Sequence, residues 1–148
     1  MGRRLRFIIP SVFAQGHEVQ KRIMAEVEKH HYCENAAFAI KLAVEEALIN
    51  AIKHGNKLDP HKTVSVEASV TPTRAEIIIE DQGAGFDRTK VPDPRADENL
   101  ERLHGRGILL MEAYMNKVQW LKGGRRVRMV RRNDDSPGGG CLSCVQNP

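Results

Sequence analysis

Apolar residues recur with helical spacing in two segments near the N-terminus. Residues 17–31 carry an apolar residue at every fourth position, which predicts an amphipathic helix. A second helix is expected from Asn35, a good N-cap residue, to Gly55, a good helix stop. Residues 38–52 of this second helix are apolar on almost every side, so most of its surface must be buried.

Alternating apolar and polar residues predict β-strands in 4–9, 63–70, 75–80, 117–121 and 125–130. Pro10 closes the first strand, and the turn residues 71–74 join the second and third strands in a hairpin. The last two strands form another hairpin, which turns at Gly123-Gly124.

The remaining segments complete the expected fold. A polar stretch, 86–104, has the length of a lid or binding loop, and residues 107–114 predict a short apolar helix. Helices gathered on one face of a mixed, mostly antiparallel sheet give an α+β fold, a two-layer α/β sandwich. We therefore expect one domain over residues 1–132 and a flexible C-terminal tail over 133–148.

Composition narrows the class of protein. Of the 148 residues, 41% are hydrophobic and 28% are charged, which is ordinary for a globular protein. No apolar run approaches the roughly 20 residues that span a bilayer. The hydrophobic part of the N-terminus is too short for a signal peptide. We therefore expect a cytoplasmic protein without a membrane segment.

The net charge of +4 reflects a basic cluster near the C-terminus. Such a cluster is more often a solvated edge strand than a surface for nucleic acid or an acidic protein. Its members are Lys122, Arg125, Arg126, Arg128, Arg131 and Arg132. The three cysteines do not make a disulfide framework. Cys141 and Cys144 form a C-x-x-C without a second pair to complete a zinc site, in a Gly-rich tail that favours disorder.

Two polar residues interrupt the apolar helix. Glu46 and Asn50 are four residues apart, so they stack on one face of a helix. A carboxylate and an amide on a helix that must bury most of its surface are costly unless something binds there. The pair is therefore a candidate functional site. Glu45 points about 100° away and can pair with Lys41 at the surface, so it stays outside the candidate set.

Two further segments carry candidate chemistry. Residues 81–86 read Asp-Gln-Gly-Ala-Gly-Phe, a D-x-G-x-G at the end of a strand, and residues 104–111 read His-Gly-Arg-Gly-Ile-Leu-Leu-Met. Together with residues 45–56, they resemble in order and spacing the three nucleotide-binding boxes of the GHKL (histidine-kinase-like) ATPase superfamily. The motifs E-A-x-x-N-A-x-x-H-G-N and G-R-G-I-x-L-M are most similar to those of the anti-sigma-factor serine/threonine protein kinases. The resemblance covers about residues 5–131 and implies the GHKL ATPase fold.

Each polar residue of these boxes has a candidate role in nucleotide binding or catalysis. The amide oxygen of Asn50 suits Mg²⁺, which also binds phosphate oxygens and water; the alternative is an asparagine satisfied by its own helix. The resemblance implies that Glu46 is the general base, which orients a protein serine hydroxyl or a water towards the γ-phosphate of ATP; the alternative is a surface glutamate. Asp81 can accept a hydrogen bond from the adenine amino group and would repel the oxygen of guanine. The alternative for Asp81 is a turn-initiating aspartate.

The glycines are expected to let a nucleotide approach the backbone. Gly83 and Gly85 give the base close access. Gly105 and Gly107 free backbone N–H groups for phosphate oxygens at the start of a helix, and Arg106 is placed to contact the phosphates or a partner protein. The alternative for this pair is hinge glycines without ligand contact. The other expected nucleotide-site residues, at the helix end near the phosphates, are His54 and Asn56.

One segment departs from the family pattern. Related proteins commonly have a threonine near adenine in the closing strand, in a G-x-T-V-like sequence. Here residues 124–129 read Gly-Arg-Arg-Val-Arg-Met, so the hydroxyl is missing. The departure bears on nucleotide affinity rather than on the location of the site.

The leading hypothesis is an ATP-dependent serine protein kinase that acts as an anti-sigma factor and regulates transcription. It would phosphorylate an anti-sigma-factor antagonist and bind a sigma factor, with ATP and Mg²⁺ as cofactors. The alternative is a nucleotide-gated protein-interaction module without kinase activity. Direct nucleic-acid binding ranks low, because aromatic residues make up only 5% of the chain and single-strand binders interleave them with basic residues. The resemblance also implies a homodimer.

Overall fold

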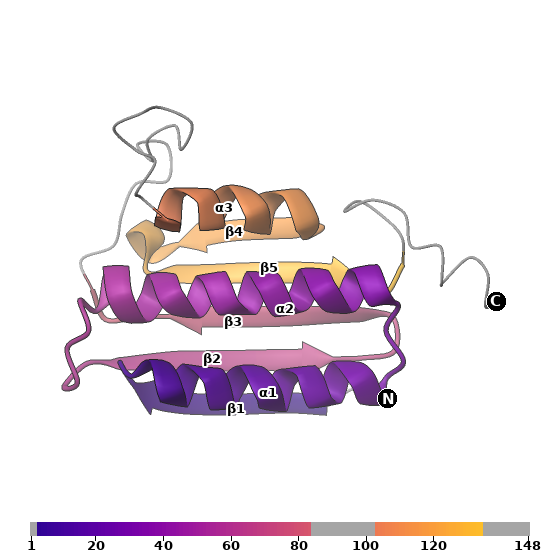
Figure 1. Cartoon of the computed structure of the whole chain (residues 1–148), viewed down its shortest axis with the longest axis horizontal. Helices are drawn as coiled ribbons and strands as arrows, with labels where there is room; N and C mark the ends of the chain where they lie inside the picture. Colours follow the sequence, from indigo (N-terminus) through magenta and orange to yellow (C-terminus); the bar gives the residue numbers. More distant parts are fainter. Residues whose placement is uncertain (1–2, 84–102, 135–148) are drawn as a thin grey trace.

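The chain forms a sheet covered on one face by helices (Figure 1). The computed structural model describes residues 3–83 and 103–134, with side chains described from residue 108 onward in the second range. In chain order the elements are β1 (Arg3–Pro10), α1 (Phe13–Lys29), α2 (Glu34–Ile49), η1 (Asn50–Gly55), β2 (Thr63–Val70), β3 (Arg74–Glu80), α3 (Leu103–Tyr114), β4 (Lys117–Leu121), η4 (Lys122–Gly124) and β5 (Arg126–Arg132). This is the α+β two-layer sandwich that the sequence predicts.

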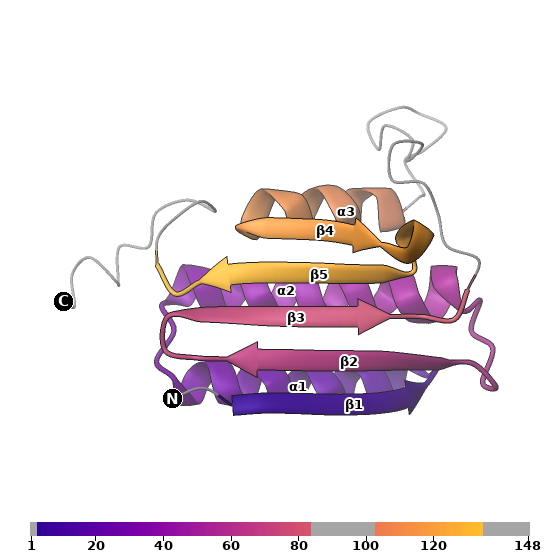
Figure 2. The same ribbon diagram turned by 180° about the vertical axis from the view of Figure 1, so that it is seen from behind.

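The sheet has the strand order β1-β2-β3-β5-β4. Every strand pair in the described ranges is antiparallel, so the expectation of a mixed sheet is wrong. The reason is that β5 returns from the last hairpin and inserts beside β3, opposite to it in direction. In Figure 2 the face away from the helices is in front, and no described element covers it.

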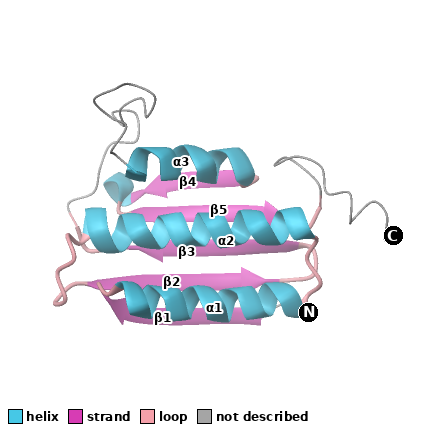
Figure 3. Cartoon of the chain, viewed as in Figure 1, coloured by secondary structure: helices cyan, strands magenta, loops and turns pink. Residues whose placement is uncertain are grey.

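Three helices form the second layer, with α2 between α1 and α3 (Figure 3). Alternate residues of β2 and β3 turn apolar side chains toward this layer, where they are buried against the inner face of α2. On the outer side of the layer, the rings of Phe38 in α2 and Tyr114 in α3 meet edge to face, with centroids 5.9 Å apart. Contacts with the sheet and with a helix on either side explain why α2 is apolar around most of its surface.

Three helix boundaries differ clearly from the sequence prediction. The predicted helix to Gly55 is α-helical only to Ile49 and then widens into the π-helical turn η1. In this turn the Asn56 N–H donates to the Ala51 carbonyl, five residues back. The helix expected from residue 107 begins earlier, at Leu103, so its glycines lie within the helix rather than before it. Helix α1 likewise begins before residue 17, at Phe13.

The basic cluster does not form an edge strand, as the commoner interpretation of the sequence expected. Strand β5 lies between β3 and β4, and on the open face its arginines form ion pairs with the glutamates of β3, for example Arg126 with Glu80. Arg131 points the other way and is fully buried, where it donates hydrogen bonds to the carbonyls of Tyr114 and Asp134. The alternation of the strand, rather than charge, decides where each arginine lies.

The described chain continues slightly past the predicted domain end. Asn133 accepts a hydrogen bond from the N–H of Cys33 at 2.8 Å and donates to the Pro72 carbonyl at 3.0 Å, so it belongs to the folded unit. Of the expected tail, 133–148, the part from residue 135 onward, including Cys141 and Cys144, lies outside the described residues, as does most of the expected lid. Among the helices of the described ranges, none combines the length and apolarity needed to cross a membrane.

Candidate functional site

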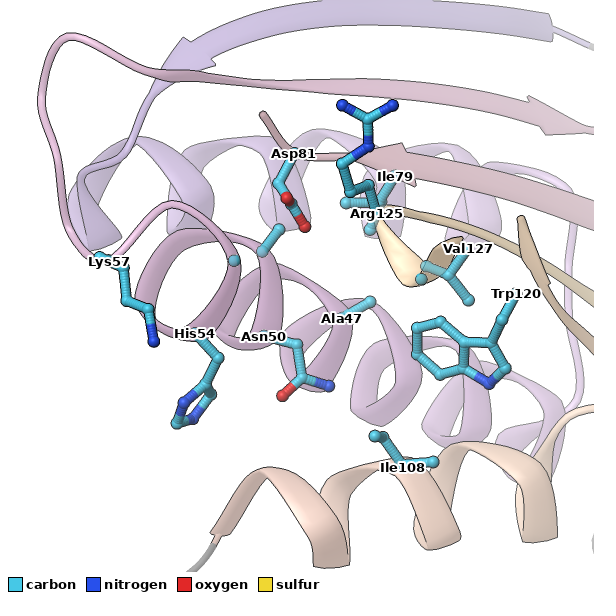
Figure 4. A pocket seen from close by; sticks show the side chains of 13 residues that line it. Ala47, Asn50, His54, Lys57, Ile79, Asp81, Ile108, Trp120, Arg125 and Val127 are labelled. Carbon is cyan, nitrogen blue, oxygen red and sulfur yellow. The ribbon is translucent and has the colours of Figure 1, made fainter. Parts of the chain in front are cut away.

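A cavity of about 280 Å³ opens where η1, the end of β3 and the start of β5 meet α3 (Figure 4). Its polar side chains come from η1 and from residues just after η1, just after β3 and just before β5. Its large apolar side chains come from the sheet and α3, and Ala47 and Ala51 add small apolar ones from α2 and η1. The lining residues are Ala47, Asn50, Ala51, His54, Gly55, Lys57, Ile79, Asp81, Ile108, Trp120, Gly124, Arg125 and Val127. All three sequence segments, 45–56, 81–86 and 104–111, thus contribute residues to one cavity.

Asn50 lies at the junction of α2 and η1 and points into this cavity (Figure 4). Its N–H bonds to the Glu46 carbonyl, so the two residues are one α-helical turn apart, as predicted. The side chain is 9% exposed, and neither its Oδ1 nor its Nδ2 has a hydrogen-bond partner among the described residues. A buried amide without partners costs about 1–3 kcal/mol. Its oxygen is the kind of ligand that Mg²⁺ accepts, so the residue fits a metal held together with a nucleotide.

Asp81 follows β3 directly and is buried at the opposite wall of the cavity. Its Oδ1 accepts a hydrogen bond of 2.7 Å from the N–H of Gly83. Burial raises the pKa of Asp81 above its usual value, against the lowering effects of this hydrogen bond and of the positive charge of Arg125. The Gly83 contact confirms a turn after the strand, and the carboxylate also lines the cavity. Its contact with adenine stays a prediction.

Asn56 holds the strand ends in place. Its Nδ2 donates to Ser11 Oγ at 2.9 Å and to the Thr63 carbonyl at 3.0 Å, and its Oδ1 accepts from the Gln82 N–H at 2.8 Å. The side chain is fully buried and does not line the cavity. Its described contacts are therefore with protein groups that position the segment after Asp81, and direct contact with a nucleotide stays a prediction.

Glu46 is half-buried on α2, one turn before Asn50, and does not line the cavity. Burial raises the pKa of Glu46 above its usual value, and the neighbouring charge of Glu45 raises it further. A carboxyl group with a raised pKa is a better proton acceptor than an ordinary glutamate. Its role as general base stays a prediction, and its position places it beside the cavity rather than inside.

The other predicted residues fall into three groups. His54 lines the cavity, and Figure 4 shows it on the same side as Asn50 and Lys57. Gly105, Arg106 and Gly107 lie near the start of α3, and the structure describes only their backbone. The first four N–H groups of a helix have no partner within it, and in α3 these include those of Gly105 and Arg106. Gly85 lies outside the described residues, and so do the side chains of residues 103–107.

Several lining residues were not singled out from the sequence. Gly55 was identified only as a helix stop, yet it contacts Asp81 directly; a Cβ at this position would lie 2.3 Å from Oδ2. Trp120 and Val127 face the cavity from adjacent strands. Strand alternation places both on the inner face with the core, so periodicity could have found them but could not distinguish a cavity wall from ordinary core.

The segment that departs from the family pattern also borders the cavity. Arg125 lines it, and its carbonyl accepts a hydrogen bond from the Asp81 N–H at 2.9 Å. Arg126 points to the open face of the sheet, where it pairs with Glu80. The described residues of the segment therefore place no side-chain hydroxyl beside Asp81.

Comparisons with known proteins identify a family for this chain. Residues 9–131 match the family described as the histidine kinase-like ATPase domain. The anti-sigma F factor of Clostridium perfringens (strain SM101) is 37% identical over 83 residues, which are 54% of this chain and 59% of that protein. The serine-protein kinase RsbW of Bacillus licheniformis is 40% identical over 86 residues, 54% of each chain. RsbW of Bacillus subtilis (strain 168) is 34% identical over 88 residues, again 54% of each.

The relatives are matched only in part, since the chain spans about half the length of the curated relatives it matches. The family match is broader and covers β2 to β4 completely, together with both walls of the cavity. Fold, cavity and sequence comparison thus agree, and the chain belongs to the histidine kinase-like ATPase domain family, with anti-sigma factors and serine-protein kinases among its relatives.

Proposed function

We propose that this protein is an ATP-dependent serine protein kinase of the anti-sigma-factor type. The observation that carries the proposal is the buried side chain of Asn50, whose two polar atoms lack partners in the described structure at the wall of the cavity. An amide kept in this state is expected to serve a ligand, because a leucine of similar size would be less costly there. Binding of ATP with Mg²⁺ would supply the missing partners.

Each residue of the site has a distinct task in this proposal. Asn50 would hold the metal, and Asp81 would accept a hydrogen bond from the amino group of adenine. When bound, ATP would supply the phosphoryl group and Mg²⁺ would neutralise part of the phosphate charge, as in phosphoryl transfer generally. Glu46 would accept the proton of a serine hydroxyl that a partner protein presents at the edge of the cavity. The N–H groups of Gly105 and Arg106, at the start of α3, would bind phosphate oxygens.

The partners follow from the relatives and are part of the proposal. Two of them are named serine-protein kinase and one is named anti-sigma F factor. By analogy, this chain would bind a sigma factor and phosphorylate an anti-sigma-factor antagonist, and so regulate transcription in the cytoplasm. A homodimer is part of the same proposal.

One observation favours a second function, a nucleotide-gated interaction module without transfer. Glu46 does not line the cavity, so the described residues place no carboxylate base within it other than Asp81. In the module, nucleotide would set partner affinity and remain intact. Both functions need the same nucleotide site, and they differ only in whether phosphate leaves it.

Transfer of labelled γ-phosphate separates the two functions. The protein is incubated with labelled Mg·ATP and a candidate antagonist, and the labelled residue is mapped. The kinase predicts label on a partner serine, lost by about 10²- to 10⁴-fold in Glu46→Gln while calorimetry still detects ATP binding. Glu45→Gln, a change of the exposed neighbouring carboxylate, is the matched control and should retain transfer at neutral pH. Transfer by Glu46→Gln at the wild-type rate would reject Glu46 as the base.

A further inference from the structure

The chain contains a single tryptophan, Trp120, and it lies at the cavity. It stands on β4 opposite Val127 of β5, and Val127 stands opposite Ile79 of β3. The three side chains therefore form one row across three strands on the inner face of the sheet, and all three line the cavity. Asp81 continues this face two residues after Ile79.

The cavity is polar at one end and apolar at the other. Figure 4 shows His54 and Lys57 on one side, Asn50 between, and the Trp120 ring opposite them. Ile108 of α3 and Val127 of β5 flank the indole. A ligand with one flat apolar end and one anionic end matches this division, and a nucleotide has both.

We propose that the indole of Trp120 is the wall on which the nucleotide base packs, so that Trp120 supplies base affinity while Asp81 supplies base selection. The inference rests on the nucleotide-binding function proposed above and adds a binding residue to it. Trp120 is only partly buried, although it packs against the core, so part of its ring remains available to the cavity.

The division of labour follows from the chemistry of the two side chains. Every base has a π-face, so contact with an aromatic ring strengthens binding of adenine and guanine nucleotides alike. A carboxylate instead distinguishes the amino group of adenine from the oxygen of guanine. Loss of the indole should therefore weaken all nucleotides by a similar factor, on the order of tenfold.

Intrinsic fluorescence tests the contact in the unmodified protein, because the emission comes from one residue. Adenosine and ADP, titrated in Mg²⁺ buffer, are expected to change the Trp120 emission in a saturable way. Inorganic tripolyphosphate, which has no base, is expected to leave it unchanged. An unchanged emission at saturating ADP, with binding confirmed by calorimetry, would overturn the inference and leave nucleotide binding intact.

Variants then separate affinity from selection. Trp120→Phe keeps an aromatic wall and should bind ATP within a few-fold of wild type, whereas Trp120→Leu should lose about tenfold for ATP and GTP alike. Val118→Ala truncates an apolar residue of the same strand outside the cavity lining, and it should lower Tm without changing nucleotide Kd. If Trp120→Leu binds ATP as wild type does, the inference fails.

The two proposals fail in different ways. A wild-type protein that binds no nucleotide in the presence of Mg²⁺ overturns the proposed function and the role of Trp120 with it. Nucleotide binding with no dependence on the ring at position 120 overturns only the inference. If Trp120→Leu does not fold, the fluorescence titration and the Trp120→Phe variant still decide the question.

Discussion

The carboxylate of Asp81 packs directly on the backbone of Gly55, at the point where η1 ends. A Cβ atom at position 55 would lie 2.3 Å from Oδ2 and 2.7 Å from Oδ1 of Asp81. The Gly55 carbonyl oxygen in turn occupies the space of a side chain at Gly83, where a Cβ would lie 2.0 Å away. Two glycines therefore let the helix end and the strand end meet around one buried carboxylate.

Gly55→Ala is expected to displace Asp81 and to weaken nucleotide binding. Overpacking of this kind costs about 1–3 kcal/mol of unfolding free energy, because backbone and carboxylate must both shift. Chemical denaturation and ATP calorimetry measure the two effects. Gly16→Ala is the control, since the atom nearest to its Cβ would be the flexible end of Ile52, at 3.1 Å, and Leu48 would lie at an ordinary contact distance of 3.9 Å. Wild-type affinity in Gly55→Ala would contradict the proposed position of Asp81 in the site.

Asn50→Leu should make the protein more stable and unable to bind Mg·ATP. The substitution removes a buried amide without partners in the described structure, a state that costs about 1–3 kcal/mol. Thermal unfolding without nucleotide is expected to show a higher Tm, and calorimetry is expected to show loss of the Mg²⁺-dependent part of ATP binding. A lower Tm in this variant would mean that Asn50 is structurally satisfied and is not reserved for a ligand.

Most of the fold could be predicted from local sequence patterns. The bounds of β2 and β4 agree with the predicted 63–70 and 117–121. A strand with one buried face alternates apolar and polar residues, and this alternation can be seen in the sequence itself. The π-helical turn could not be predicted, because nothing in residues 50–55 distinguishes it from a continued α-helix. The π-helical turn ends at Gly55, where Asp81 packs on the backbone, and this is a tertiary contact between residues far apart in the sequence.

The candidate site was predictable where residue type implies chemistry. In the sequence, the apolar neighbours of Asn50 indicate that it is a candidate functional residue. In the structure, Asn50 and Asp81 line the same cavity. Asn56 shows the limit of that approach, because a buried asparagine that bridges three segments has the same sequence signal as a ligand. Arg131 shows another limit, because it lies in a basic run that suggests an exposed side chain, whereas the structure buries it fully.

Glu45→Gln is expected to lower the pKa of Glu46. The negative charge of Glu45 is the second cause of the raised pKa, after burial, so its removal leaves the pKa of Glu46 raised by burial alone. A base works when deprotonated, so transfer falls as pH drops through its pKa. The acid limb of the pH–rate profile should therefore move to lower pH in Glu45→Gln. Carboxyl NMR titration of Glu46 checks the same shift without activity, and an unchanged titration would contradict it.

Asp81→Asn should raise stability at neutral pH while it weakens ATP binding. Burial raises the folded-state pKa of Asp81 above its usual 3.8, so the folded protein binds this proton more tightly than the unfolded chain does. The resulting stability is fully present below the unfolded pKa and is lost as pH rises through the folded pKa.

At pH 7 the neutral asparagine avoids the cost of a buried charge, and its oxygen can still accept the bond from Gly83. The Tm of Asp81→Asn is therefore expected to exceed that of wild type at pH 7 and to approach it as pH falls towards 4. Glu18→Gln, which removes an exposed charge on α1, is the control and should leave the Tm at pH 7 nearly unchanged. A lower Tm in Asp81→Asn at pH 7 would mean that interactions with the ionised carboxylate outweigh its burial. The buried charge would then stabilise the fold instead of being retained at a cost for a ligand.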